Sequence, residues 1–188
     1  MLIKVASCSL NQTPLDWSGN FSNIVSAIQE AREQNIKVLC LPELCITGYG
    51  LEDLFASDFV HENALKALGE IAANTYDMIV SVGLPIVFNG FVYNCACLLV
   101  DGKVAGFVPK QFLAQNGIHY EGRWFKAWSS GVVDSVNLSG VDYPFGDLLF
   151  KINDLRLGFE ICEDAWVPNR PGANLSRAGV DIILNPSA

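Results

Sequence analysis

Three side chains with complementary chemistry occupy the same kind of position in this sequence. Glu43, Lys110 and Cys162 each come just after an apolar run that has the character of a β-strand. A cysteine of the core would lie within such a run, whereas the carboxyl ends of strands are where α/β sheets place their chemistry. If the three strands are neighbours, their ends bring a base, a cation and a thiol to one rim.

The thiol of Cys162 needs assistance to react at neutral pH. Its reference pKa is near ~8.5, and the thiolate is the reactive form. Acids adjacent in sequence are expected to raise that pKa further, whereas the Lys110 ammonium is expected to lower it. These neighbouring acids are Glu160, Glu163 and Asp164. Attack of the sulfur on a carboxamide would give a tetrahedral oxyanion, which an ammonium such as Lys110 can stabilise.

Glu43 completes the predicted reaction as the carrier of protons. It lies among Leu41, Pro42 and Leu44, and an apolar setting raises a carboxyl pKa toward the value of a useful general base. It could return a proton to departing ammonia and then activate water to cleave the thioester. Taken singly, a glutamate or lysine after a strand is usually a solvated loop residue, so the hypothesis depends on the joint pattern.

Strand and helix patterns alternate along the chain and predict an α/β fold in one domain over residues 1–188. The expected strands are residues 2–10, 36–41, 78–84, 92–100, 104–108, 146–152, 155–161 and 180–184. The expected helices are residues 20–34, 52–55, 62–74 and 174–178. The first strand is predicted to be buried, and Pro85 to end the third. Asp101-Gly102 and Asn153-Asp154 predict hairpins, which make the sheet arrangement mixed.

The composition argues against several functional classes. A net charge of −8 and a pI of about 4.6 leave no basic stripe for a nucleic-acid partner. No stretch reaches the ~18 apolar residues of a transmembrane helix, and no signal peptide is visible. We therefore expect no membrane partner and a cytoplasmic location. The hydrophobic content of 51% is high for a soluble domain and indicates buried strands and a surface that packs on another body.

The six cysteines contain no CxxC motif, and most lie within apolar strand patterns. Cys95 and Cys97 alternate along one strand face, which fits a packed core better than metal ligation. We predict reduced structural thiols for every cysteine except Cys162. No metal site is predicted.

Three sequence blocks at these residues resemble a known family. LPELCITGY at 41–49, VPKQFLAQNGIHYEGRWF at 108–125 and GFEICEDAW at 158–166 are similar to the motif blocks of the nitrilase superfamily of carbon-nitrogen hydrolases. The sequences of these blocks most resemble those of the glutaminase domains of glutamine-dependent NAD+ synthetases. The resemblance runs over essentially all 188 residues. It implies a nitrilase-like four-layer α-β-β-α sandwich.

The resemblance also implies roles for six residues. Glu43 matches the general base of that family, Lys110 the residue that stabilises the oxyanion, and Cys162 the nucleophile. Two further positions match the substrate pocket, namely Tyr49 and Glu163. Glu121 matches a second glutamate that orients the lysine.

The implied parent protein is a larger synthetase. The resemblance implies glutamine as the substrate, no cofactor for this domain, and ATP and Mg²⁺ only for a synthetase domain that is absent from this chain. Family domains continue beyond the closing NPSA, so we expect the C-terminal part of the domain to be missing and this piece to be poorly active alone. Open strand edges then predict a homo-oligomer. Residues 114–117 depart from the family pattern, so pocket contacts there do not transfer.

Other interpretations remain open from the sequence. Another nitrilase-like amidase, acting on carbamoyl or aliphatic amide substrates, would share the same three residues. A Cys-His glutaminase would use His61 or His119, but Cys162 lacks the Gly-flanked elbow expected there. A non-catalytic assembly module would place an aromatic group at an interface. That group comprises Tyr120, Trp124, Phe125 and Trp128.

Overall fold

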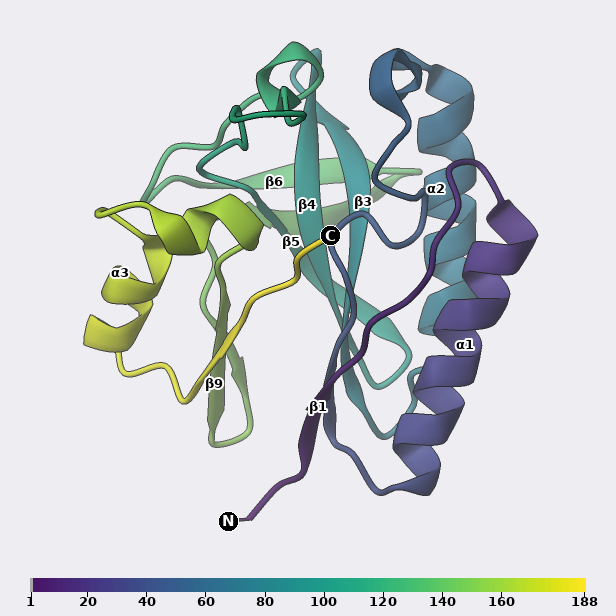
Figure 1. The fold of residues 1–188 in the computed structure, drawn as a ribbon. Helices are drawn as coiled ribbons and strands as arrows, with labels where there is room; N and C mark the ends of the chain where they lie inside the picture. Colours follow the sequence, from purple (N-terminus) through teal and green to yellow (C-terminus); the bar gives the residue numbers. More distant parts are fainter. Residues whose placement is uncertain (1) are drawn as a thin grey trace.

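The computed structural model describes residues 2–188 and arranges them in four layers. Helices α1 (Trp17–Glu33) and α2 (Asp58–Ala72) pack on one face of a seven-stranded sheet. A three-stranded sheet packs on the other face, and the short helix α3 (Pro171–Arg177) lies on its far side (Figure 1). This is the α-β-β-α sandwich that the resemblance implied.

Both sheets are composed of the strands that the apolar runs indicated, together with one further hairpin. The seven-stranded sheet has the order β1-β2-β3-β4-β5-β7-β6, with parallel pairs at β1–β2, β2–β3 and β5–β7 and antiparallel pairs elsewhere. Its strands are β1 (Val5–Ser7), β2 (Val38–Cys40), β3 (Ile79–Phe88), β4 (Phe91–Val100), β5 (Lys103–Pro109), β6 (Val133–Leu138) and β7 (Val141–Gly146).

The smaller sheet has the order β10-β9-β8, with β9 parallel to β10 and antiparallel to β8. Its strands are β8 (Phe150–Ile152), β9 (Leu155–Phe159) and β10 (Ile182–Leu184). Both predicted hairpin turns form. At the β4–β5 turn, Asp101 and Gly102 both have positive φ (48° and 79°), as a two-residue turn of this hand requires.

The strand predictions differ from the structure in several details. The first strand covers only Val5–Ser7 and is not buried, because β1 is an edge strand and Val5 is 53% exposed. The strand expected at 146–152 begins only at Phe150. The hairpin of β6 and β7 was not predicted, although Ser139 and Gly140 form its turn with positive φ.

Pro85 does not end the third strand, since β3 continues to Phe88. The Ser81 and Gly83 carbonyls accept backbone hydrogen bonds from the 41–46 segment, at 3.1 Å each. Backbone groups alternate sides along a strand, so the Pro85 nitrogen faces this same side and points away from β4. The β3–β4 ladder therefore loses no hydrogen bond at the proline.

The two long helices form where they were predicted, but each begins earlier in the sequence than expected. The Asp16 side chain caps α1 by accepting from the Gly19 N–H at 2.9 Å, so the helix starts at Trp17 rather than residue 20. Helix α2 starts at Asp58, directly after the 3₁₀ helix η1 (Glu52–Ala56). Within residues 2–188, no helix combines the length and apolar character needed to cross a membrane.

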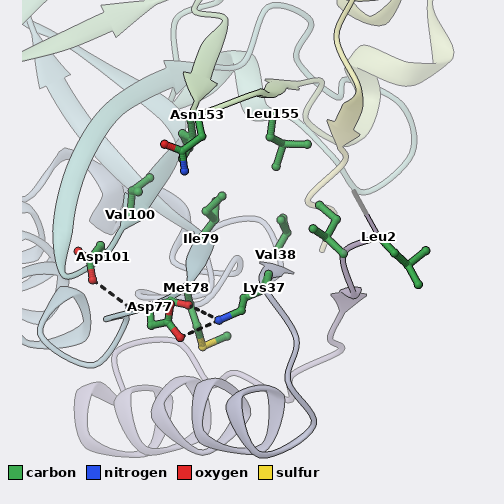
Figure 2. Close-up of a pocket in the computed structure, with 12 residues that line it drawn as sticks. Leu2, Lys37, Val38, Asp77, Met78, Ile79, Val100, Asp101, Asn153 and Leu155 are labelled. Carbon is green, nitrogen blue, oxygen red and sulfur yellow. Dashed lines mark hydrogen bonds and ion pairs between the residues drawn. The ribbon is translucent and has the colours of Figure 1, made fainter.

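Two apolar cores hold the layers together. One lies between the helices and the large sheet, and the other lies between the two sheets, where residues of β2, β4 and β5 meet residues of β8, β9 and β10. At one end this second core opens into a groove of about 510 Å³ (Figure 2). Val38, Ile79 and Leu155 line it, and Lys37 pairs with Asp77 at its rim. The groove lies at the opposite end of β2 from Glu43.

Candidate active site

The three predicted residues follow strands that are not neighbours. Glu43 follows β2 and Lys110 follows β5, which are separated in the large sheet by β3 and β4. Cys162 follows β9 in the other sheet. The expectation that these three strands are neighbours was therefore wrong. Their ends still converge because the two sheets face one another, and the charges of Glu43 and Lys110 both act on the Cys162 thiol.

A tight turn places Glu43. The Leu41 N–H continues the β2 alignment by donating to the Ser81 carbonyl at 3.1 Å, and Leu44 then adopts a positive φ of 49°. The turn passes directly over Gly83, where any Cβ would lie 2.2 Å from the Leu44 nitrogen. Glycine at this point of β3 is thus what permits the Glu43 turn to pack against the sheet.

Lys110 lies between two carboxylates in the interior. Its Nζ is 2.7 Å from Glu43 Oε1 and 2.9 Å from the Glu121 carboxylate, and all three residues are at most 3% exposed. The backbone also holds it, because the Lys110 N–H donates to the Asn94 carbonyl at 2.8 Å. A buried ammonium with two hydrogen-bonded carboxylates is a compensated group with a fixed position.

Glu121 connects this cluster to Tyr49. It opens the 3₁₀ helix η2 (Glu121–Arg123), accepts the Tyr49 hydroxyl at 2.8 Å and accepts the Ala114 N–H at 2.7 Å. Its contact with Lys110 is the geometry expected of a group that orients the lysine. Tyr49 is itself turned toward Glu121, so its predicted substrate contact stays a prediction.

Asn94 is a member of the cluster that was not predicted from the sequence. It lies within β4, and its Nδ2 donates to Glu43 Oε1 at 2.7 Å and lies 3.5 Å from Glu121 Oε1. The available signal was a single amide inside the apolar run FVYNCACLLV, at a position where an unpaired polar group would be costly.

Cys162 does not lie on the face that strand alternation predicted. The alternation of β9 holds through Glu160, which faces Gly172 of α3. Cys162 then adopts φ of 46° and begins the 3₁₀ helix η3 (Cys162–Trp166), while its N–H donates to the Pro186 carbonyl at 3.0 Å. This turn moves the half-buried thiol onto the inter-sheet core, on the side of Glu43 and Lys110.

The acids that act on the thiol also differ from those expected. Burial raises the pKa of Cys162 most, Glu43 raises it next, and Lys110 lowers it. Two of the acids adjacent to Cys162 in the sequence make other contacts. Glu160 pairs with Arg170, and Asp164 accepts backbone N–H groups. The opposing effect of the Lys110 ammonium is as predicted.

The pKa of Glu43 is raised, as predicted, and the pKa of Lys110 is raised as well. Burial is the main cause that raises the pKa of Glu43, and Glu121 adds to it, while Lys110 and Asn94 act against it. Burial lowers the pKa of Lys110, but the two carboxylates outweigh burial and the net direction is upward. The lysine thus stays an ammonium while Glu43 is poised to hold a proton.

Neither histidine is engaged as a partner of the thiol. His61 Nε2 lies 2.7 Å from the Phe55 carbonyl on the helix side of the large sheet. His119 is exposed, with Nδ1 3.3 Å from the Tyr49 hydroxyl, and so is not packed in the interior. These contacts do not support the Cys-His interpretation.

The remaining predictions have mixed outcomes. Phe125 packs on Phe55, and Trp128 packs on Phe145, so these two aromatics belong to the core rather than to an interface. All six cysteines are free, and four are buried as expected, whereas Cys8 is half-exposed. Glu163 is half-buried beside Cys162, and its substrate contact stays a prediction. Within residues 2–188, no group of three acidic, histidine or cysteine side chains is placed to bind a metal ion.

Comparison with known proteins agrees with the fold and shows the family. The sequence pattern of the carbon-nitrogen hydrolase family matches residues 4–188. This chain belongs to the carbon-nitrogen hydrolase family. The glutamine-dependent NAD(+) synthetases of Rattus norvegicus and Saccharomyces cerevisiae are each 35% identical to it, over 98% and 99% of this chain. The chain spans only 27% and 28% of their lengths.

Two solved structures share the fold. A glutamine-dependent NAD(+) synthetase from Cytophaga hutchinsonii superposes with a TM-score of 0.90 at 49% identity, covering 99% of this chain and 30% of that one. An amidase from Nesterenkonia sp. superposes with a TM-score of 0.72 at 23% identity, covering 98% and 64%. The second likeness concerns the fold alone. The resemblance inferred from the three sequence blocks is thereby confirmed.

Proposed function

We propose that this chain is the glutaminase part of a glutamine-dependent NAD+ synthetase. It would hydrolyse glutamine to glutamate and ammonia, and the ammonia would serve ATP-dependent NAD+ synthesis from deamido-NAD+ in a separate domain. The observation that carries the proposal is the buried Glu43–Lys110–Glu121 cluster beside the Cys162 thiol. Support for glutamine comes from the relatives, which are glutamine-dependent enzymes.

The first half of the reaction forms a thioester. Glu43 takes the proton of the Cys162 thiol as the sulfur bonds to the carboxamide carbon, and the oxygen becomes an oxyanion beside the Lys110 ammonium. When the oxyanion collapses, the C–N bond breaks and Glu43 gives its proton to the leaving nitrogen, which departs as ammonia. A carboxyl whose pKa is raised by burial suits this exchange better than an ordinary glutamate.

The second half hydrolyses the thioester. Glu43 removes a proton from water, the hydroxide bonds to the acyl carbon, and Lys110 again faces the developing oxyanion. Collapse breaks the C–S bond, and the sulfur regains its proton as glutamate leaves. Glu121 would hold Lys110 in place through both halves by its contact of 2.9 Å.

Labelling with a glutamine-like chloroketone tests the proposal. We expect the reagent to alkylate Cys162 and to leave the other five cysteines unmodified, as measured by peptide mass spectrometry. Excess glutamine should slow the labelling, whereas an aliphatic amide of similar size should not. Cys8→Ala is the matched control, since Cys8 is the other half-exposed thiol.

Two results would contradict the proposal. Labelling that survives in Cys162→Ala would place the nucleophile elsewhere. Protection of Cys162 by a simple aliphatic or carbamoyl amide, but not by glutamine, would instead favour a different amidase of the same family.

A further inference from the structure

The side chain of Asn94 lies where β4 passes beneath the proposed base. Asn94 is 1% exposed, and its Nδ2 is 2.7 Å from Glu43 Oε1 and 3.5 Å from Glu121 Oε1. With Nδ2 on this side the amide donates to carboxylate oxygens, whereas the reverse orientation would place its Oδ1 acceptor against two ionised carboxylates. Asn94 is thus a donor to Glu43.

The two oxygens of Glu43 have different surroundings. Oε1 accepts from Asn94 Nδ2 and from Lys110 Nζ, each at 2.7 Å. Oε2 is buried and has no hydrogen-bond partner within residues 2–188. Donated hydrogen bonds stabilise negative charge on the atom that accepts them, so Oε2 is the oxygen whose lone pairs remain available for a proton. An acceptor left buried without a partner is costly and calls for an explanation.

The sheet itself does not need this side chain. The contact between β4 and Lys110 is a backbone hydrogen bond from the Lys110 N–H to the Asn94 carbonyl, which any residue at position 94 would supply. The neighbouring positions of β4 are apolar, as expected for a central strand in a core. The amide group therefore serves the carboxylate cluster rather than the strand.

We propose that Asn94 is a positioning residue. It donates a hydrogen bond to Glu43 Oε1, so that the other oxygen, Oε2, exchanges protons with Cys162. This inference rests on the proposed function of Glu43 as general base and adds the residue that orients it. Asn94 acts through Glu43, since its side-chain hydrogen bonds go to the carboxylates of Glu43 and Glu121. The charged and titratable groups that face Glu43 are Lys110, Glu121, the Tyr49 hydroxyl and the Cys162 thiol.

Asn94→Leu in the full-length protein tests the proposal, because leucine has a similar shape and no donor. We expect kcat for glutamine to fall by about 30-fold to 100-fold while KM changes by less than about threefold, since general-base catalysis contributes ~10² or more. The alkylation rate of Cys162 by iodoacetamide at pH 7 should fall at least about fivefold. That second readout requires no substrate and follows proton removal from the thiol.

Ser81→Ala is the matched control. Ser81 is buried on the adjacent strand β3, and its Oγ has no hydrogen-bond partner within residues 2–188. We expect its kcat and alkylation rate to stay within about twofold of those of the unmodified protein. Thermal unfolding of each variant shows whether it is folded. If Asn94→Leu does not fold, Asn94→Ala also removes the donor, adds no charge and is expected to show the same losses.

The outcomes are distinct. Unchanged kcat and alkylation in a folded Asn94 variant would overturn the inference, as would equal losses in Ser81→Ala. If the unmodified protein turns over no glutamine, the proposed function fails. The alkylation comparison still decides the role of Asn94 in that case.

Discussion

At the scale of single residues, the unusual feature is two buried carboxylates that share one ammonium. Glu43 and Glu121 both contact Lys110, which leaves one negative charge in excess in the interior. Burial is the main reason why the pKa of Glu43 is raised although a lysine lies beside it, and the negative charge of Glu121 adds to this effect. A proton can therefore rest on Glu43 at little cost, which is the property that the proposed reaction requires.

Lys110→Met should be strongly destabilising because it leaves the two carboxylates buried and uncompensated. We expect the free energy of unfolding at pH 7.5 to fall by roughly 3–5 kcal/mol. The loss should be smaller at pH 5, where protonation removes the repulsion. Urea unfolding at both pH values measures this change.

Lys37→Met is the control for that variant. Its pair with Asp77 has the same distance of 2.7 Å, but both side chains are exposed. Its removal should cost much less stability than the removal of Lys110, because solvent screens an exposed pair. Equal losses for the two lysines would show that burial of the Lys110 cluster is not what matters.

At the scale of elements, the site depends on turns that follow strands. The Glu43 turn lies on Gly83, and the Cys162 turn opens η3 with a positive φ. Asp164 ties η3 to the segment after Lys110 by accepting from the N–H groups of Gln111 and Phe112 at 3.1 and 2.7 Å. These contacts fix the segments that carry Glu43, Lys110 and Cys162 relative to one another.

Gly83→Ala should displace the Glu43 turn. The new Cβ would meet the Leu44 nitrogen at 2.2 Å and the Glu43 carbonyl carbon at 2.9 Å, and both are backbone atoms. We expect kcat to fall at least about tenfold and the unfolding midpoint to drop. Gly69→Ala, where the added Cβ has open space on α2, should instead stabilise the chain by about 0.5–1 kcal/mol. An active Gly83→Ala enzyme would contradict this account of the turn.

Asp164 should give the chain a stability that depends on pH. Burial raises the pKa of Asp164 to about 6 from its ordinary 3.8. The folded chain then binds that proton more tightly than the unfolded chain. The contribution is full below about pH 4 and is lost as pH rises through about 6, a change of about 3 kcal/mol at most.

Asp164→Asn should remove this slope in urea unfolding between pH 4 and 7. Asp181→Asn is the control, because Asp181 accepts a single exposed N–H, from Arg156. It should leave the slope in place. A slope that persists in Asp164→Asn would assign the pH dependence to another group.

At the scale of the whole molecule, the candidate site bridges two sheets. The base and the cation follow strands of the large sheet, and the thiol follows a strand of the small one. Their relative positions therefore depend on the apolar core between the sheets. The core between the large sheet and the helices supports only one side of the site.

Two core variants separate these contributions. Leu157 lies between the sheets, Ile71 lies on the buried face of α2 toward the large sheet, and both are fully buried. Each change to alanine should cost about 2–5 kcal/mol of stability. Only Leu157→Ala should also slow alkylation of Cys162 by the glutamine-like chloroketone, by at least about fivefold. Equal rates in the two folded variants would refute this dependence on the inter-sheet core.

Local patterns were sufficient for much of the fold. The apolar runs placed most strands, and Asp101-Gly102 specified its hairpin because that pair tolerates positive φ. They were insufficient at β1, whose apolar residues lie at an exposed edge, and at Pro85, whose tolerance depends on which side of the strand has a partner. Asn94 was missed because one polar residue in an apolar strand has no periodic signature.

The sequence by itself determined the chemical groups and the family: a thiol, a base and a cation, each after a strand, in blocks shared with carbon-nitrogen hydrolases. The tertiary structure alone decided which groups meet. The positive φ of Cys162 places its thiol on the inter-sheet side. Because the two sheets face one another, the acids that act on this thiol are Glu43 and Glu121 rather than those adjacent to it in the sequence. Electrostatic interactions depend on distance in space, and spacing along the chain does not specify that distance.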